Sequence, residues 1–148
     1  YQIRPYNSGL IVLKFPGCEL RQKVARWETK GHKEIWQLCM EPGFELSWSA
    51  HNPFYGLFVV QEGTVEVRID GMEKFTAKER DILHIPSHLS GEITASNGAV
   101  LFDYNCEGQG LRAMEELYAL FTADPKRAAE EADAILRKHQ CYLRGRMR

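Results

Sequence analysis

Short runs of β-branched and aromatic residues alternate with turn signals across residues 42–97. The turn signals are the pairs Glu62-Gly63, Asp70-Gly71 and Asn97-Gly98. Glycine, and to a lesser degree Asn and Asp, tolerates the positive φ of a tight hairpin turn. Several short strands at this spacing predict tight hairpins that pack into an antiparallel sandwich or barrel.

The residues before this region combine a strand signal with an ambiguous one. Residues 10–15 form an apolar candidate strand. Leu20, Val24 and Trp27 follow at the i, i+4, i+7 spacing of a short helix, although an edge strand accounts for them nearly as well. We treat residues 1–31 as an N-terminal arm and residues 32–106 as the body of the barrel.

Beyond residue 111 the apolar positions change to helical period. Two stripes are visible: Met114, Leu117, Tyr118 and Phe121, then Ala128, Ala132, Ile135, Leu136 and His139. Asp124 is a candidate N-cap and Pro125 a favoured first helical residue. Residues 111–148 are therefore predicted to form a helical hairpin, as part of the same domain or as a dimerisation element. We expect the basic residues 144–148 to be a solvated terminus.

The run 44–51 alternates strictly between two kinds of side chain. One face carries Phe44, Leu46, Trp48 and Ala50, and the other carries Glu45, Ser47, Ser49 and His51. In the ordinary amphipathic strand the apolar face points to the core and the polar face to water. The opposite orientation would place a carboxylate, two hydroxyls and an imidazole inside the barrel.

Composition narrows the class of protein. A chain of 148 residues is most simply one domain, and its 44% apolar and 26% charged residues are typical of a globular protein. A net charge of −1 gives no basis for nucleic-acid binding by the whole chain. With no long apolar run and no signal-peptide pattern, we expect a cytoplasmic protein without a membrane partner. The four cysteines form no CxxC pair and are expected to be free thiols.

Two motifs in the β-rich body resemble those of the cupin superfamily of small jelly-roll barrels. The segment VQEGTVEVRIDG at 60–71 is similar to the end of the first cupin motif, and RDILHIP at 80–86 is similar to the second. The resemblance covers about half of the chain. It implies a mainly β, antiparallel jelly-roll barrel, here followed by a C-terminal helical hairpin.

Cupins usually hold a metal ion with two histidines and a glutamate of the first motif and one histidine of the second. The resemblance places Ser49, His51 and Gly56 at the first three of these positions and Gly91 at the fourth. Only His51 matches, so we expect no metal and no other cofactor. If a divalent metal is bound, a rebuilt site would use His51, His84, His88 and Glu45.

The resemblance also favours the orientation in which the polar face of residues 44–51 points inward. Trp36, Tyr55, Phe58 and Tyr104 are further candidates for the interior by position. The expected ligand-binding residues are Glu45, Ser47, Ser49, His51, Tyr55, His84 and Tyr104. On this interpretation Phe44, Leu46 and Trp48 face outward and need a cover, which a homodimer partner, the N-terminal arm or the helical hairpin would supply.

Three functions fit these features. The first is a metal-free small-molecule-binding domain for a sugar or small organic acid, since a barrel followed by helices resembles the effector-binding half of AraC-type regulators. Nucleic acid would then be a partner only through a DNA-binding module outside this chain. The second is a cupin-type enzyme, a dioxygenase, isomerase or lyase, with His51 as the catalytic candidate. The third is a structural module whose interior is filled by its own side chains.

Substitution of the predicted pocket residues separates the three functions. We expect His51→Ala or Ser49→Ala to abolish ligand binding in a sensor and turnover in an enzyme, and to change only stability in a structural module. Unchanged ligand affinity and unchanged activity in His51→Ala would contradict both pocket-based functions.

Overall fold

The computed structural model describes residues 3–30, 33–48, 50, 55–106, 110–139 and 143–147. Of these, residues 26, 105, 106, 110, 111 and 143–147 are described by their backbone alone. The strands are β1 (Val12–Phe15), β2 (Cys18–Val24), β3 (Glu34–Met40), β4 (Phe44–Trp48), β5 (Gly56–Ile69), β6 (Phe75–Lys78), β7 (Ile82–Ile85), β8 (Gly91–Ala95), β9 (Ala99–Cys106) and β10 (Leu143–Met147). The helices are the short 3-10 helix η1 (Arg26–Thr29), α1 (Gly110–Ala123) and α2 (Pro125–Lys138).

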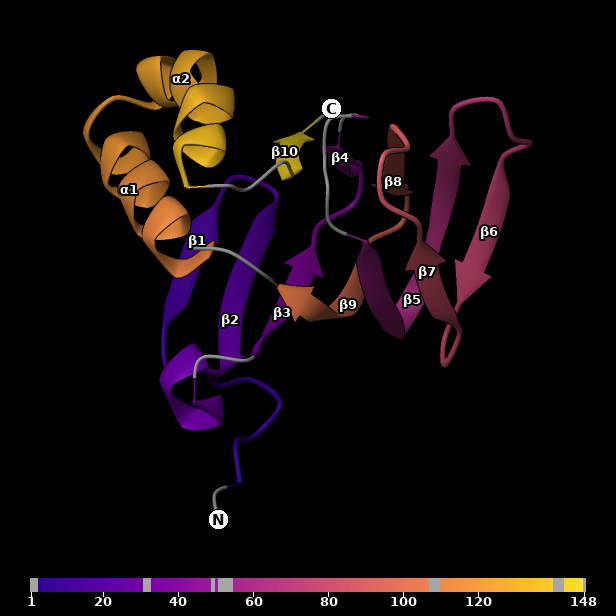
Figure 1. Ribbon diagram of the computed structural model, residues 1–148, viewed down its shortest axis with the longest axis horizontal. Coiled ribbons are helices and arrows are strands. Elements are labelled where there is room, and N and C mark those ends of the chain that lie inside the picture. Colours follow the sequence, from indigo (N-terminus) through magenta and orange to yellow (C-terminus); the bar gives the residue numbers. More distant parts are fainter. Residues whose placement is uncertain are drawn as a thin grey trace.

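The strands form two antiparallel sheets that face each other and share β5 (Figure 1). Sheet A contains β1, β2, β3, β9, the first half of β5 and β7. Sheet B contains the second half of β5 with β6, β8, β4 and β10. The predicted mainly β, antiparallel barrel with a C-terminal helical hairpin is confirmed.

Strand β5 passes from one sheet to the other at Gly63. Its pairing with β9 is irregular between Val60 and Glu62, and Gly63 has a φ of 75°. The hairpin predicted at this glycine is therefore wrong, because the extra residue bends a continuous strand instead of reversing it. The turns at Gly71 and Gly98, with φ of 79° and 82°, do join successive strands as predicted.

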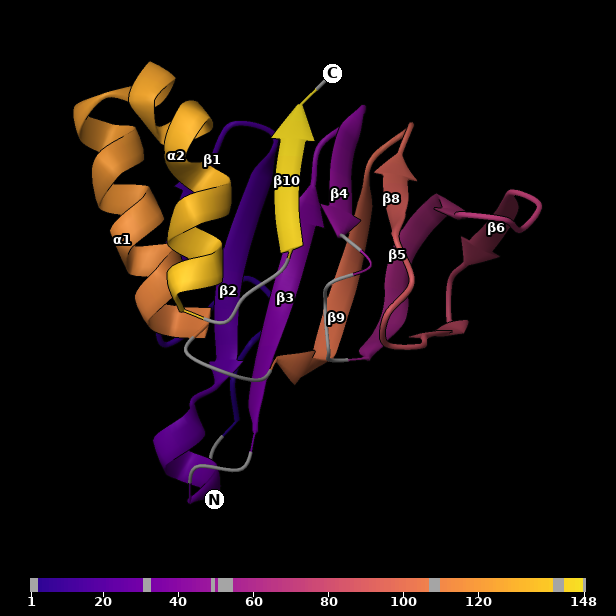
Figure 2. The same ribbon diagram turned by 45° about the horizontal axis from the view of Figure 1, so that its top comes forward.

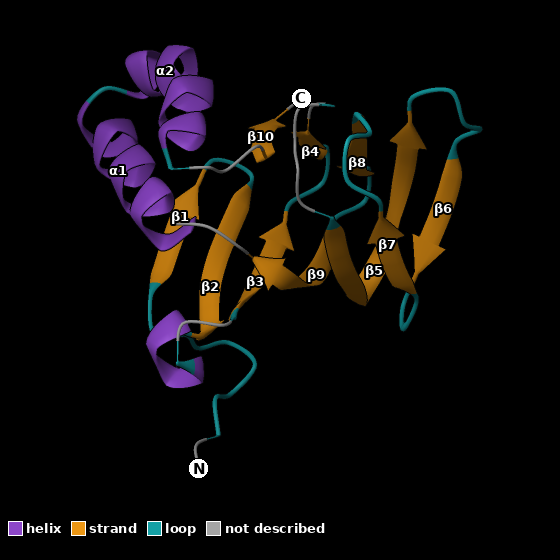
Figure 3. Ribbon diagram, in the orientation of Figure 1, coloured by secondary structure: helices purple, strands orange, loops and turns teal. Residues whose placement is uncertain are grey.

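The two C-terminal helices cover the part of sheet A that sheet B leaves open (Figures 2 and 3). Met114 and Tyr118 of α1 pack against the core, and the Tyr118 ring meets Phe15 of β1 edge-on at 5.7 Å between centroids. Asp124 caps α2 by accepting a hydrogen bond from the backbone N–H of Arg127, as predicted. None of the described helices is both long and apolar enough to cross a lipid bilayer.

Two terminal segments differ from their sequence-based predictions. The helical interpretation of Leu20, Val24 and Trp27 is wrong. Leu20 and Val24 belong to strand β2, which confirms the strand alternative there, and Trp27 belongs to the 3-10 helix η1. The basic end of the chain is not a solvated tail: residues Leu143–Met147 form β10, which pairs with β4 at the edge of sheet B (Figure 2). Strands β2 and β10 form because each pairs with a neighbouring strand, and the local sequence does not reveal that pairing.

The orientation of β4 is the reverse of the one favoured from the resemblance. Phe44, Leu46 and Trp48 belong to the buried core between the sheets. Their register partners include Ile93 of β8, which in turn pairs with Val67 of β5, so this whole face is apolar. The face is therefore not an exposed dimer surface, and the apolar side of β4 points to the core.

A pair of glycine substitutions tests the bend in β5. We expect Gly71→Ala to lower the free energy of unfolding by about 1–2 kcal/mol, because the positive φ of this residue is strained for alanine. No atom lies within 4 Å of the Cβ that alanine would add there. We expect Gly63→Ala to cost roughly 1–3 kcal/mol more, because its added carbon would lie 2.6 Å from the carbonyl oxygen of Gly98. Urea unfolding of both variants measures the difference, and equal losses would contradict a close approach at Gly63.

Candidate functional site

A row of side chains crosses the inner face of sheet A on four neighbouring strands. Gln22 of β2 is paired with Trp36 of β3, Trp36 with Asp103 of β9, and Asp103 with Phe58 of β5. Register partners on antiparallel strands lie on the same face, so these four side chains are neighbours. All four are buried, and Phe58 and Trp36 belong to the core between the sheets.

Glu34 extends this row along β3. It lies two residues before Trp36 and therefore on the same face, and its Oε2 accepts a hydrogen bond of 2.9 Å from Trp36 Nε1. This buried bond fixes the plane of the Trp36 ring. We call Gln22, Glu34, Trp36 and Asp103 the interior polar cluster.

Two buried N–H groups have no acceptor in the part of the chain that the structure describes. Gln22 Nε2 and Trp48 Nε1 lack a hydrogen-bond partner among the described residues. Gln22 is 1% exposed and Trp48 is 7% exposed, so water does not reach either side chain freely. Because an unsatisfied buried donor costs about 1–3 kcal/mol, its retention in a core calls for an explanation.

The strands that carry these groups are directed toward one end of the barrel. β3 and β5 begin there, and β9 and β4 run toward it (Figure 2). The interior polar cluster therefore lies toward that end, whereas the rest of the core between the sheets is apolar. Aromatic rings with a few placed polar groups are typical of a small-molecule site.

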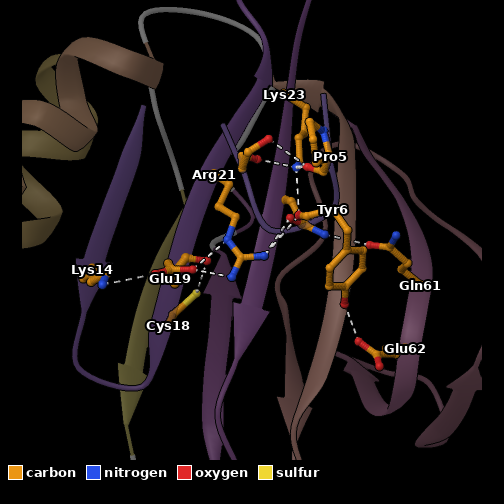
Figure 4. Close-up of polar contacts among 11 residues, drawn as sticks. Pro5, Tyr6, Lys14, Cys18, Glu19, Arg21, Lys23, Gln61 and Glu62 are labelled. Atoms are coloured by element: carbon orange, nitrogen blue, oxygen red, sulfur yellow. Dashed lines mark hydrogen bonds and ion pairs between the residues drawn. The ribbon is translucent and has the colours of Figure 1, made fainter. Parts of the chain in front are cut away.

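The one lysine among the described buried residues lies on the other face of sheet A. Lys23 is buried beside Gln22 but on the opposite face of β2, where its Nζ donates hydrogen bonds to the carbonyl oxygens of Pro5 (2.6 Å), Tyr6 (2.8 Å) and Ser8 (Figure 4). Burial lowers the pKa of Lys23, and the charge of Arg21 lowers it further. These bonds hold the N-terminal arm against the outer face of sheet A.

Arg21 and Tyr6 complete this outer network. Arg21 donates to Gln37 Oε1 at 3.2 Å and forms an ion pair of 2.5 Å with Glu19. Tyr6 donates its hydroxyl to Glu62, and burial together with this carboxylate raises the pKa of Tyr6 to about 12 (Figure 4). The network is structural, since its members bind one another and the arm.

The residues predicted to bind ligand are distributed over several surfaces. Ser49 and His51 lie outside the described residues. Glu45 and Ser47 lie on the face of β4 opposite the core, although Glu45 is fully buried there. This placement corrects the prediction that they line the interior.

The remaining candidates are also outside the barrel. His84 lies on the exposed face of β7, where its ring meets that of Tyr55 at 5.8 Å. Tyr104 is exposed and packs beside Phe102, because Asp103 between them takes the inward position. His88 is exposed in the turn after β7, with a φ of 63°. Of the four aromatic candidates, Trp36 and Phe58 face the interior as expected, whereas Tyr55 and Tyr104 do not.

Sequence reasoning missed Gln22, Glu34 and Asp103. Asp103 had a usable signal, since Ala99, Leu101 and Asp103 alternate along β9 and the apolar members face inward. Gln22 had no such signal, because the residues around it fit a short helix and an edge strand nearly equally well. Glu34 could be located only once its bond to Trp36 was known.

The described residues do not fit the metal site that the resemblance implies. No group of three or more His, Cys, Asp or Glu side chains in the described part of the chain is arranged to hold a metal ion. At Gly91, where the resemblance places a histidine, an added carbon would lie 2.5 Å from Arg68 O and 2.7 Å from the Trp48 ring. At Gly56 it would lie 2.9 Å from the Phe58 ring. The rebuilt metal site predicted from the sequence would use His84 and Glu45, among others. These two residues lie on different sheets.

Comparisons with known proteins bear on the fold. No protein-family model and no curated protein sequence matches the chain. Among solved structures it is similar to a predicted oxalate decarboxylase from Thermotoga maritima, with a TM-score of 0.57 and 11% identity over 70% of this chain and 96% of that one. It is also similar to an RmlC-like cupin from Shewanella frigidimarina, with a TM-score of 0.56 and 16% identity over 68% and 87%.

A third similar structure is the ectoine synthase from P. lautus, with a TM-score of 0.57 and 14% identity over 71% of this chain and 75% of that one. At such identities the likeness concerns the fold and not the activity. These matches agree with the two motifs at residues 60–71 and 80–86 and with the observed pair of sheets. The chain therefore has the jelly-roll fold of the cupins.

Proposed function

We propose that this chain is a small-molecule-binding cupin domain with a sensing or regulatory role, which takes a sugar or small organic acid at the interior polar cluster. The observation that carries the proposal is the buried amide of Gln22 in this cluster, whose Nε2 has no hydrogen-bond partner among the described residues; Trp48 Nε1 on sheet B is a second such donor. A ligand that supplies acceptors to these groups would recover the free energy that the free protein loses by burying them. The helical hairpin after the barrel supports the regulatory part of the proposal.

An enzyme is the alternative. The ectoine synthase and the predicted oxalate decarboxylase show that this fold hosts catalysis in other proteins. A reaction in this chain would need an acid and a base, and Asp103 and His51 are the candidates in the barrel body. Turnover in the binding experiments below would favour this alternative.

The proposal predicts that Gln22 is retained at the expense of stability. We expect Gln22→Met, which keeps the shape and removes the amide, to stabilise the free protein by roughly 1–2 kcal/mol in urea unfolding. The matched control is Gln37→Met on the neighbouring strand, because Gln37 is equally buried but bonded to both Arg21 and Gln61. Loss of the Gln37 amide leaves Arg21 and Gln61 without these hydrogen bonds, so we expect Gln37→Met to destabilise the protein by about 1–3 kcal/mol.

The same variants test binding. In a thermal-shift panel of neutral aldoses, polyols and small organic acids, we expect at least one compound to raise the Tm of the wild-type protein and of Gln37→Met. The shift should be lost in Gln22→Met. A Gln22→Met protein destabilised as much as Gln37→Met would show that the amide has a structural role, and this result would contradict the proposal.

Metal content gives an independent test. After purification without chelator and incubation with manganese, iron, nickel or zinc, we expect far less than one ion per chain by elemental analysis. The reason is that Gly56 and Gly91 provide no ligand at two of the four expected positions. Close to one ion per chain, lost in His51→Ala, would instead support a rebuilt metal site and the enzyme alternative.

A further inference from the structure

We propose that this chain forms a homodimer in which two copies pack face to face through one part of the outer face of sheet A. The part in question lies on three neighbouring strands and consists of Leu57, Val59, Ile82, His84, Phe102 and Tyr104. We call it the β7–β5–β9 surface. The dimer does not depend on the ligand proposed for the interior, because this surface lies on the other side of the sheet.

Sheet register brings the six residues of the β7–β5–β9 surface together. Val59 of β5 is paired with Ile82 of β7 on one side and with Phe102 of β9 on the other, and Leu57 is paired with His84. Register partners on antiparallel strands share a face. Each strand contributes two of the six residues, and the residue between those two is buried, so all six face outward.

The β7–β5–β9 surface differs in charge from the rest of the sheet exterior. None of its six residues is Asp, Glu, Lys or Arg. The outer face of sheet B, in contrast, carries Arg68 and Glu92, which form an ion pair of 3.2 Å. On the other half of sheet A, Arg21 and Lys23 bind the N-terminal arm across β2 (Figure 4). A sheet face that meets only water is ordinarily polar, so this surface has the character of an interface.

The area of the surface meets what a specific dimer needs. Ile82 is 70% exposed and Tyr104 is 37% exposed, while Tyr55, whose ring meets that of His84, is 42% exposed. With the partly exposed residues between them, the surface presents roughly 500 Å² per chain, from the areas typical of such side chains. Two copies would therefore bury about 1,000 Å² in total, which is the lower limit for a specific interface and suits a dimer of moderate affinity.

The geometry of the rings favours a second copy over a flat ligand. The rings of Phe102 and Tyr104 are inclined by 53° and those of Tyr55 and His84 by 63°, so they do not form a level platform. Inclined side chains interlock with those of another sheet, as the inner faces of a sandwich do. A two-fold axis places this surface against its own copy, and without acidic or strongly basic residues it meets no like charge there.

Sedimentation velocity of the full chain at pH 7.5 tests the dimer, from low micromolar to several hundred micromolar protein. We expect the average mass to rise from that of one chain toward twice that value, with a dissociation constant in the micromolar range. Ile82→Glu and Tyr104→Glu should each weaken association by at least about tenfold, because each would bury an unpaired carboxylate in the interface.

The matched control is Met72→Glu. Met72 is 60% exposed, much like Ile82, but it lies in the turn between β5 and β6, away from the β7–β5–β9 surface. We expect this variant to associate as the wild-type protein does. Circular dichroism checks the fold of every variant, and Ile82→Ser and Tyr104→Ser repeat the test if a glutamate variant does not fold, with an expected weakening of several-fold.

Three results would overturn the proposed dimer. The first is a wild-type protein that remains a single chain at several hundred micromolar. The second is an association that Met72→Glu weakens as much as Ile82→Glu does. The third is an association that Ile82→Glu weakens and Tyr104→Glu leaves unchanged, because this result would indicate pairing along the β7 edge instead of packing between faces. Weakening by both Ile82→Glu and Tyr104→Glu, with Met72→Glu unchanged, supports the proposal.

Discussion

Strand β5 is the element on which the rest of this molecule depends. It pairs with β7 and β9 in sheet A and with β6 and β8 in sheet B, so it is the strand that joins the two sheets. The strand crosses between the sheets by bending at Gly63, where the backbone passes close to the carbonyl of Gly98. A side chain at this position would press on the Gly98 backbone and destabilise the bend that brings the two inner faces together.

The enclosed core explains the character of the site. Most of its residues are aliphatic or aromatic, so each polar group inside it has lost its contacts with water. Glu34 and Trp36 satisfy each other, whereas the N–H groups of Gln22 and Trp48 do not find partners in the described protein. A binding site must keep such groups available for its ligand, and it therefore gives up stability in the free state.

The N-terminal arm has a role that local sequence did not suggest. Lys23 and Arg21 bind backbone carbonyls of the arm on the outer face of sheet A, and their charges are thereby kept out of the interior. Alternation along β2 places Gln22 inside and Lys23 outside, so one strand supplies an uncharged donor to one face and a cation to the other.

The amino-acid sequence by itself determined the fold class, two of the three turns in the β-rich body, and the start of the second helix at Pro125. Each of these depends on local properties: alternation, tolerance of positive φ, and helix capping. Only the tertiary structure decided which face of β4 points inward, that Gly63 bends a strand, and that residues 143–147 add an edge strand. Alternation defines two faces of a strand but does not say which one is buried, because that depends on the strands packed against it. For the same reason Gln22, Glu34 and Asp103 became a candidate site only when sheet register brought them together.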